Sequence, residues 1–230
     1  MASNVHVESF ARPTDPPIRG WLHSPDPASG DALILTHGAG GNAQAPLLVA
    51  LAETFSAAGI TVLRCNLPFR QIRSFGLPGP SDAGRDRAGL KLAITAMKEI
   101  ASRRIFLGGH SYGGRQSSML CAEEPSLVAG LLLLSYPLHP PRKPEQQRTQ
   151  HLPDLRTPTL FFHGTRDPFG SIPELEKAIK MIPGKTRLVP VEGAEHDLGF
   201  KGKARQEELP ELIVSEFAKF FELPSRGRDF

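Results

Sequence analysis

The sequence predicts an α/β protein built on a mostly parallel sheet, and three observations lead to this prediction. Apolar runs of strand length alternate with segments of helical periodicity from about residue 32 onward. Most of these runs are continuously apolar, as expected for strands that helices cover on both faces. The 230 residues are 40% hydrophobic and 22% charged, which is typical of a folded globular protein and argues against a disordered chain.

Two strands are expected before the alternation begins. Val5–Phe10 and Ile18–Leu22 are strand-like segments separated by a proline-rich stretch, which favours an antiparallel pair at the edge of the sheet. The remaining strands are expected to be parallel and to lie at Ala32–Thr36, Ile60–Cys65, Ile105–Leu107, Leu131–Ser135, Thr159–Phe162 and Arg187–Val191.

Amphipathic helices should cover this sheet. Pro46–Ala58, Arg87–Arg103 and Glu208–Glu222 each repeat apolar residues at helical spacing, which predicts one apolar face for each helix. Gly59 follows the first of them and is a typical helix stop. The polar segment His139–Arg156 contains four prolines and is expected to be an irregular excursion. Residues 1–223 are therefore expected to form a single domain, followed by a frayed tail at residues 224–230.

Charge and hydropathy exclude several classes of function. The sequence has 27 basic and 24 acidic residues, and the basic residues are scattered without interleaved aromatic residues, so no nucleic-acid partner is expected. The longest apolar run, Leu127–Leu134, is far below the ~18 residues of a membrane span, so no membrane partner is expected. The N-terminal segment lacks the basic and apolar regions of a secretory signal, which predicts a cytoplasmic protein. No pattern indicates an oligomeric state.

No metal or cofactor is expected either. Cys65 and Cys121 lie in apolar surroundings without metal-binding spacing, which predicts two buried small side chains and no disulfide. Neither the Gly-x-x-x-x-Gly-Lys motif of phosphate-binding loops nor the His-Glu-x-x-His motif of metalloproteases occurs.

The clearest chemical motif is centred on Ser111. The segment Gly109-His-Ser-Tyr-Gly113 follows the strand expected at Ile105–Leu107 and precedes a stretch compatible with a helix. It is therefore a Gly-x-Ser-x-Gly motif at a strand-to-helix turn. A serine on so tight a corner needs the flanking glycines, because side chains at those positions would collide with the neighbouring strand and helix.

An acid and a histidine follow the serine in the chain order that this chemistry requires. Asp167 lies in the loop after the strand Thr159–Phe162, and His196 lies in the loop after the strand Arg187–Val191. Because the carboxyl ends of parallel strands meet at one edge of a sheet, these loops should bring Asp167 and His196 to Ser111. The sequence therefore predicts a catalytic triad.

Other polar residues near these loops are assigned lesser roles. His163 ends a strand but precedes the acid loop, so a hydrogen-bonded structural histidine is expected. His139 and His151 lie in the irregular excursion, where no strand holds them. Asp197 cannot easily turn back onto the ring of His196, so a solvated or pocket-lining carboxylate is expected.

A loop of small residues after the strand Ala32–Thr36 predicts the second half of the site. Acyl transfer needs backbone N–H groups aimed at the developing oxyanion. One such group is expected from the residue after the nucleophile, here Tyr112, and the other from this early loop, here Ala39.

The same loop leaves an alternative from another class open. Gly38–Ala43 also fits Gly-x-Gly-x-x-Ala, the dinucleotide-binding fingerprint, and Arg64 on the next strand is a candidate partner for a 2′-phosphate. An NADP-binding protein would leave Ser111, Asp167 and His196 unexplained.

The ordered motifs, with His37-Gly-Ala-Gly-Gly among them, resemble the α/β-hydrolase superfamily over essentially the whole chain. Cys65-Asn-Leu-Pro-Phe69 and Gly108-Gly-x-Ser-x-Gly-Gly-Arg115 resemble the capless dienelactone-hydrolase-like branch, which includes the testis-expressed and non-specific-lethal-complex hydrolase-like proteins. The resemblance implies an α/β-hydrolase fold and a serine hydrolase, most simply a carboxylic-ester hydrolase. The branch also contains non-catalytic members, so a hydrolase-like interaction protein is the alternative.

The site is expected to bind a small ester. Only Pro137–Pro158 separates two neighbouring strands, which is too short for a cap domain, so the strand-end loops must form the pocket. Arg70 is a candidate contact for an anionic acyl group, with a solvated loop position as the alternative. The candidate apolar walls, each of which is equally compatible with the core, are Phe69, Tyr112, Tyr136, Leu138, Phe169 and Leu198.

Overall fold

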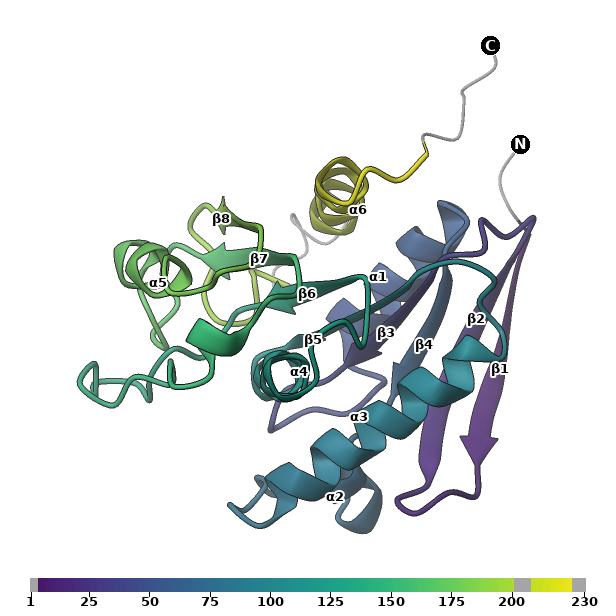
Figure 1. Ribbon diagram of the computed structural model, residues 1–230, viewed down its shortest axis with the longest axis horizontal. Coiled ribbons are helices and arrows are strands. Elements are labelled where there is room, and N and C mark those ends of the chain that lie inside the picture. The colour runs from purple at the N-terminus through teal and green to yellow at the C-terminus, as the bar shows by residue number, and fades with distance from the viewer. Residues whose placement is uncertain (1–3, 201–207, 225–230) are drawn as a thin grey trace.

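Eight strands form one sheet in the order β1-β2-β4-β3-β5-β6-β7-β8 (Figure 1). The structure is a computed structural model and describes residues 4–200 and 208–224. The C-terminal tail that the sequence predicts lies, except for Pro224, outside the described residues.

The sheet combines an antiparallel edge with a parallel centre. β1 (Asn4–Arg12) pairs antiparallel with β2 (Ile18–Asp26), which pairs antiparallel with β4 (Thr61–Cys65). The other strand pairs are parallel, and the predicted α/β class with an antiparallel N-terminal edge is confirmed. The remaining strands are β3 (Ala32–Thr36), β5 (Ile105–His110), β6 (Gly130–Leu134), β7 (Thr159–Gly164) and β8 (Thr186–Val191).

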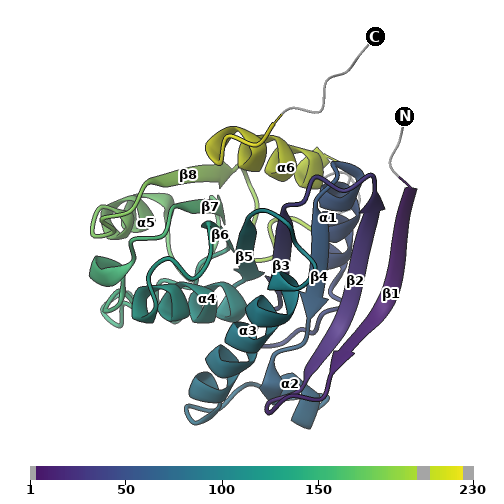
Figure 2. The same cartoon turned by 45° about the vertical axis from the view of Figure 1, so that its right-hand side comes forward.

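Helices cover both faces of the sheet (Figures 1 and 2). α1 (Pro46–Ala57) and α6 (Glu208–Phe220) pack on one face, where the predicted helices lie within two residues of their expected ends. The other face carries α2 (Pro68–Ile72), α3 (Asp82–Lys98), α4 (Tyr112–Glu123), α5 (Ile172–Ile179) and the short 3₁₀ helix η1 (Leu152–Asp154).

The central strands separate two apolar cores. In β3, Leu33 and Leu35 belong to the core beneath α1 and α6, whereas Ile34 belongs to the core on the opposite face. All three side chains are fully buried, because successive residues of a strand point to opposite faces and helices cover both. This arrangement explains why the strands are continuously apolar in the sequence.

The helix predicted at Arg87–Arg103 is shifted. α3 begins at Asp82 and ends at Lys98, and Ile100 is 39% exposed beyond its end. The chain must leave the helix there to enter β5, and the backbone N–H of Arg103 already donates to the carbonyl oxygen of Gly30. This hydrogen bond to Gly30 replaces a further turn of helix, and helical periodicity in the sequence does not reveal it.

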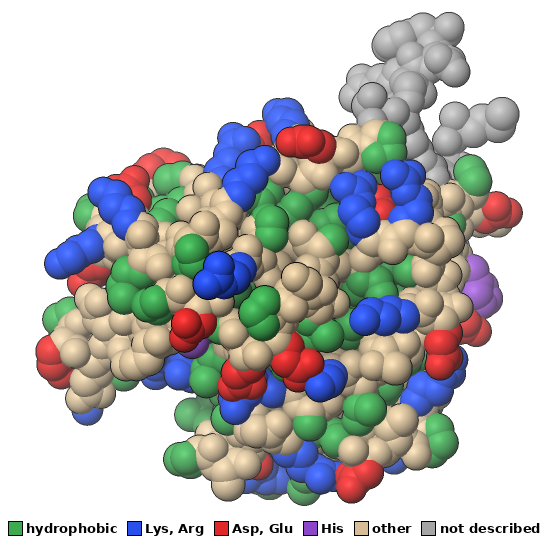
Figure 3. Space-filling view, in the orientation of Figure 1, with side chains coloured by type: hydrophobic (Ala, Val, Ile, Leu, Met, Phe, Trp, Pro, Cys, Tyr) green, Lys and Arg blue, Asp and Glu red, His purple; other side chains and the backbone are tan. Residues whose placement is uncertain are grey.

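Cys65 and Cys121 are buried free thiols, as predicted. Burial raises the pKa of each to about 12, so both remain protonated small side chains. No helix within the described ranges has the length and hydropathy needed to cross a bilayer. On the face drawn in Figure 3, basic side chains are interspersed with acidic ones.

Phe217 anchors α6 to the sheet. Its fully buried ring lies 5.0 Å from the ring of Phe55 in α1 and 4.9 Å from that of Phe106 in β5, measured between centroids. Both contacts are edge-on, an arrangement that aromatic pairs favour. The ring therefore joins two helices and a central strand.

Replacing Phe217 with Ala is expected to lower the free energy of unfolding by about 3–5 kcal/mol, because a large cavity forms where three elements meet. The matched control is Leu212→Ala in the same helix, where the side chain is 42% exposed. We expect the control to cost less than about 1 kcal/mol. Urea unfolding followed by circular dichroism measures both, and equal losses would contradict this description of the core.

Candidate active site

Ser111 lies on a strained turn between β5 and α4. Its φ of 51° and ψ of −116° are unusual for a residue other than glycine. The turn is held from both sides, because the Ser111 N–H donates to the carbonyl oxygen of Leu134 at 2.8 Å and the Ser111 carbonyl accepts from the Arg115 N–H at 2.9 Å. The side chain is thereby presented at the carboxyl end of β5.

Two glycines make this turn possible. A Cβ atom on Gly113 would lie 2.5 Å from the carbonyl oxygen of His37 and 2.7 Å from Cγ2 of Thr36, at the end of β3. A Cβ atom on Gly109 would lie 2.8 Å from the backbone nitrogen of Gly114 in α4. Real Cβ atoms essentially never approach this closely. The collisions with strand and helix that the motif predicts are therefore present.

The structure brings Ser111, His196 and Asp167 together. The Nε2 atom of His196 lies 2.8 Å from the Ser111 Oγ atom, and its Nδ1 atom lies 2.8 Å from Oδ2 of Asp167. A carboxylate only accepts hydrogen bonds, so Nδ1 carries the hydrogen and Nε2 is free to accept from the serine hydroxyl. This is the hydrogen-bonding order that a nucleophile, a base and an orienting acid require.

The Asp167 carboxylate is fully buried and tightly held. Its Oδ1 atom accepts from the backbone N–H of Phe169 at 2.8 Å. His163, 3.7 Å from Oδ2, donates from Nε2 to the carbonyl oxygen of Gly170 at 2.7 Å and so closes the same loop. His163 is thus the hydrogen-bonded structural histidine that the sequence predicts.

Two further contacts hold His196, one to its ring and one to its backbone. The Phe169 ring stacks on it with a centroid distance of 4.1 Å and an interplanar angle of 29°. His110, the residue before the serine, donates from Nε2 to the carbonyl oxygen of His196 at 2.8 Å. Burial lowers the pKa of His110 to about 4, so its ring is neutral and ties the histidine loop to β5.

The loop after β3 lies against the nucleophile and has its first carbonyl oxygen bound on the side away from the Ala39 N–H. Gly38 lies against the nucleophile, because a Cβ atom there would be 3.3 Å from Cβ of Ser111. Its carbonyl accepts from Nδ1 of His37 at 2.8 Å and from the Gly41 N–H at 3.0 Å. In a trans peptide the N–H points opposite to the carbonyl, so the Ala39 N–H is directed away from these partners.

His37 links this loop to the segment between β4 and α2. Its Nδ1–H bonds the loop carbonyl, while its Nε2 atom accepts from the Leu67 N–H at 3.1 Å. Burial lowers the pKa of His37 to about 4, so the ring stays neutral and keeps this tautomer. Tyr112, the second predicted oxyanion donor, is the first residue of α4, where backbone N–H groups have no partner within the helix.

Arg70 differs from its prediction as either a substrate contact or a solvated side chain. The residue is buried, and its guanidinium donates to the carbonyl oxygens of Ala39 and Gly41 at 2.7 and 2.8 Å and to that of Gly76 at 2.8 Å. Five N–H groups on a rigid fork suit it to bind several carbonyls at once. Arg70 therefore holds the loop that carries Ala39.

Arg64, the candidate 2′-phosphate partner in the dinucleotide-binding alternative, is not available to a ligand. Arg64 is buried and donates from Nε to Nε2 of His23 at 3.0 Å and from Nη1 to the carbonyl oxygen of Ala43. Its charge is therefore engaged inside the protein. The Gly38–Ala43 loop instead lies against Ser111.

A cleft of about 920 Å³ opens over Ser111 and His196. Among the predicted walls, Tyr112 and Phe169 line it, and Asp197 lines it as well. The other four predicted walls belong to the core and do not line the cleft, because each is at most 1% exposed: Phe69, Tyr136, Leu138 and Leu198.

Five polar residues in the wall of the cleft were absent from the predicted site: His110, Arg115, Gln116, Arg148 and Glu195. Arg115 could have been found, because it falls in the first turn of the helix that follows Ser111. Arg148 comes from the excursion after β6, where the sequence has no periodicity to orient it. The loop between α2 and α3 carries two exposed apolar side chains, Phe75 at 84% and Leu77 at 70% exposure.

The sequence matches a known family over most of its length. The family model described as "Alpha/beta hydrolase domain" matches residues 29–222. This range includes the loop after β3, the serine turn and the loops that carry Asp167 and His196.

Several solved structures share the fold at low sequence identity. A dienelactone hydrolase from Anabaena variabilis is 22% identical, with 95% of this chain and 99% of that chain covered and a TM-score of 0.73. An α/β serine hydrolase without a lid from Xanthomonas campestris is 16% identical, with 94% and 95% covered and a TM-score of 0.73. A Pyrococcus furiosus esterase is 17% identical, with 94% and 91% covered and a TM-score of 0.72.

Replacing Gly113 with Ala is expected to lower the free energy of unfolding by about 1–3 kcal/mol, because the new methyl group overlaps the His37 carbonyl oxygen and the Thr36 side chain at the end of β3. The control is Gly84→Ala in α3, where a Cβ atom meets nothing within 4 Å. We expect the control to leave stability unchanged or raise it by up to about 1 kcal/mol. Thermal unfolding measures both, and a neutral Gly113→Ala would show that the turn is not sterically constrained.

Proposed function

Since the chain belongs to the alpha/beta hydrolase domain family, we propose that it is a serine hydrolase that cleaves a small carboxylic ester. The observation that carries the proposal is the continuous hydrogen-bonded series Ser111–His196–Asp167, with 2.8 Å at each step. One structural relative is an esterase, which supports an ester as the substrate. The cleft above the serine supplies room for a small molecule.

In the first half of the reaction, the Ser111 Oγ atom attacks the carbonyl carbon of the ester. His196 accepts the hydroxyl proton at Nε2, and Asp167 stabilises the imidazolium that results. When the tetrahedral intermediate collapses, the bond from carbon to the alcohol oxygen breaks. His196 donates its proton to that oxygen, so the alcohol leaves neutral and the acyl group stays on Ser111.

The charge that develops on the carbonyl oxygen needs donors that are already in place. The backbone N–H groups of Ala39 and Tyr112 are the proposed donors. Arg70 and His37 bind the carbonyls of the Ala39 loop, which keeps that loop from turning its own oxygens toward the oxyanion.

Water completes the cycle. His196 removes a proton from the water, whose oxygen attacks the acyl carbon and forms a second tetrahedral intermediate. The bond to Ser111 Oγ then breaks, His196 returns the proton to that oxygen, and the carboxylic acid is released. The ring must remain in place through both halves, and its contacts with Phe169 and His110 serve this need.

We expect Ser111→Ala, His196→Ala and Asp167→Asn each to lose at least about 10³-fold in kcat on 4-nitrophenyl acetate, because the triad acts as a unit. The double variant Ser111→Ala/His196→Ala should lose little more than either single variant. Release of 4-nitrophenol measures the rate, and circular dichroism checks that each variant is folded.

Wild-type turnover in Ser111→Ala would refute the proposal. Absence of hydrolysis in the folded wild-type protein would favour the non-catalytic interaction protein instead.

A further inference from the structure

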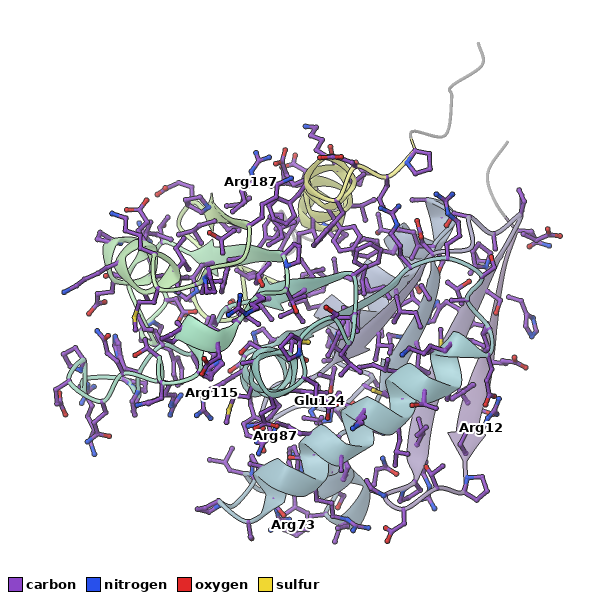
Figure 4. The ribbon with its side chains drawn as sticks, in the orientation of Figure 1. Arg12, Arg73, Arg87, Arg115, Glu124 and Arg187 are labelled. Carbon is purple, nitrogen blue, oxygen red and sulfur yellow. The ribbon has the colours of Figure 1, made fainter. Side chains whose placement is uncertain are left out.

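The cleft has a basic wall that the proposed chemistry at Ser111 does not use. Arg115 and Arg148 both line it, and Gln116 lies beside them. Arg115 lies in the first turn of α4, and its backbone N–H donates to the Ser111 carbonyl oxygen at 2.9 Å. Figure 4 shows Arg115 on the side of α4 that faces the segment containing η1.

No carboxylate of the described chain neutralises this wall. Neither Arg115 nor Arg148 takes part in any ion pair among the described residues. Arg148 donates from Nη1 only to a neutral acceptor, the carbonyl oxygen of Pro137, at 3.2 Å. Burial and the nearby charge of Arg115 both lower the pKa of Arg148, so the two guanidinium groups oppose each other.

His151, which lies close to Arg115, is neutral and does not offset the positive charge of the arginines. The Ser118 hydroxyl donates to the Arg115 carbonyl oxygen at 2.9 Å, so it accepts from Nε2 of His151 at 2.8 Å. The pKa of His151 is lowered to about 4 by burial and by the charges of Arg115 and Arg87. His151 is therefore a neutral packing partner of this wall.

Buried N–H groups without acceptors add to the excess of donors. Gln116 is fully buried, and its Oε1 atom accepts from Nη1 of Arg87 at 3.0 Å. Figure 4 shows Arg87 between α3 and α4. Within the described residues, the Nε2 atom of Gln116 and the Nε atom of Arg115 are buried and have no hydrogen-bond partner. Native proteins rarely leave such donors unpaired.

The carboxylates that do line the cleft lie on a different loop. Glu195 and Asp197 flank His196 after β8, whereas Arg115 and Arg148 come from α4 and from the excursion after β6. The cleft is therefore acidic beside the catalytic base and basic beside the helix that carries the nucleophile. A substrate with an anionic group would be oriented by this difference.

We propose that Arg115 and Arg148 form a subsite for a carboxylate of the substrate, so that the enzyme acts on esters that carry a free carboxylate. This inference rests on the proposed hydrolase function. The guanidinium fork matches a carboxylate geometrically, and two forks together supply more donors than its oxygens can accept. Bound there, the carboxylate provides the acceptors and the negative charge that the wall lacks.

Two pairs of substrates test the proposal and locate the carboxylate. Monoethyl succinate against ethyl succinamate places a carboxylate or a neutral carboxamide on the acyl side. Butyryloxyacetate against butyryloxyacetamide places them on the alcohol side. We expect kcat/KM to favour the carboxylate about tenfold or more in one of the pairs. Equal values within both pairs, measured on the wild-type protein, would overturn the proposal.

Variants assign the preference to the two arginines. In Arg115→Met and in Arg148→Met the preference for the carboxylate should fall about tenfold, while Arg115→Lys should keep part of it through its charge. Lys143→Met, which removes one exposed charge from the same excursion, should keep the full preference. A preference that survives in both arginine variants would overturn the assignment. Failure of the proposed function is distinguishable, because then none of the four esters is hydrolysed.

Discussion

The left-handed backbone of Ser111 is the constraint on which the rest of the site depends. It exists because Gly109 and Gly113 leave room for the end of β3 and the start of α4 to approach each other. That approach places the serine beside the Gly38 loop and puts the first N–H groups of α4 next to the nucleophile. One tight turn thereby positions the nucleophile and both proposed oxyanion donors.

Buried polar side chains around this turn keep the surrounding loops in place. His37 and His110 are neutral because burial lowers their pKa values to about 4, and each donates to a backbone carbonyl of an active-site loop. Arg70 is buried and binds carbonyl oxygens of two loops. These contacts hold the loops rigid, as preorganised catalysis requires.

Much of this arrangement could be predicted from the sequence. The parallel sheet follows from continuous apolar strands, and the meeting of Ser111, Asp167 and His196 follows because each is placed in a loop at the carboxyl edge of that sheet. The glycine spacing has a steric cause that can be stated without coordinates, and the structure reproduces it.

The remainder depends on contacts between distant parts of the chain. Whether Tyr136 or Leu138 faces the cleft or the core cannot be read from an apolar residue after a strand, and both are buried in the core. Arg70 binds carbonyls about thirty residues earlier in the chain, which no local pattern reveals. The start of α3 at Asp82 and the short α5 likewise lack a long apolar stripe.

The measurement that tests the central claim most directly is covalent labelling of the folded protein with a fluorophosphonate, followed by mass spectrometry of its peptides. The serine oxygen displaces fluoride only where a base activates it and donors stabilise the charged oxygen on phosphorus. The account predicts one adduct per chain, on Ser111, and its loss when His196 is replaced with Ala. A folded wild-type protein without an adduct, or with an adduct elsewhere and Ser111 unmodified, would contradict it.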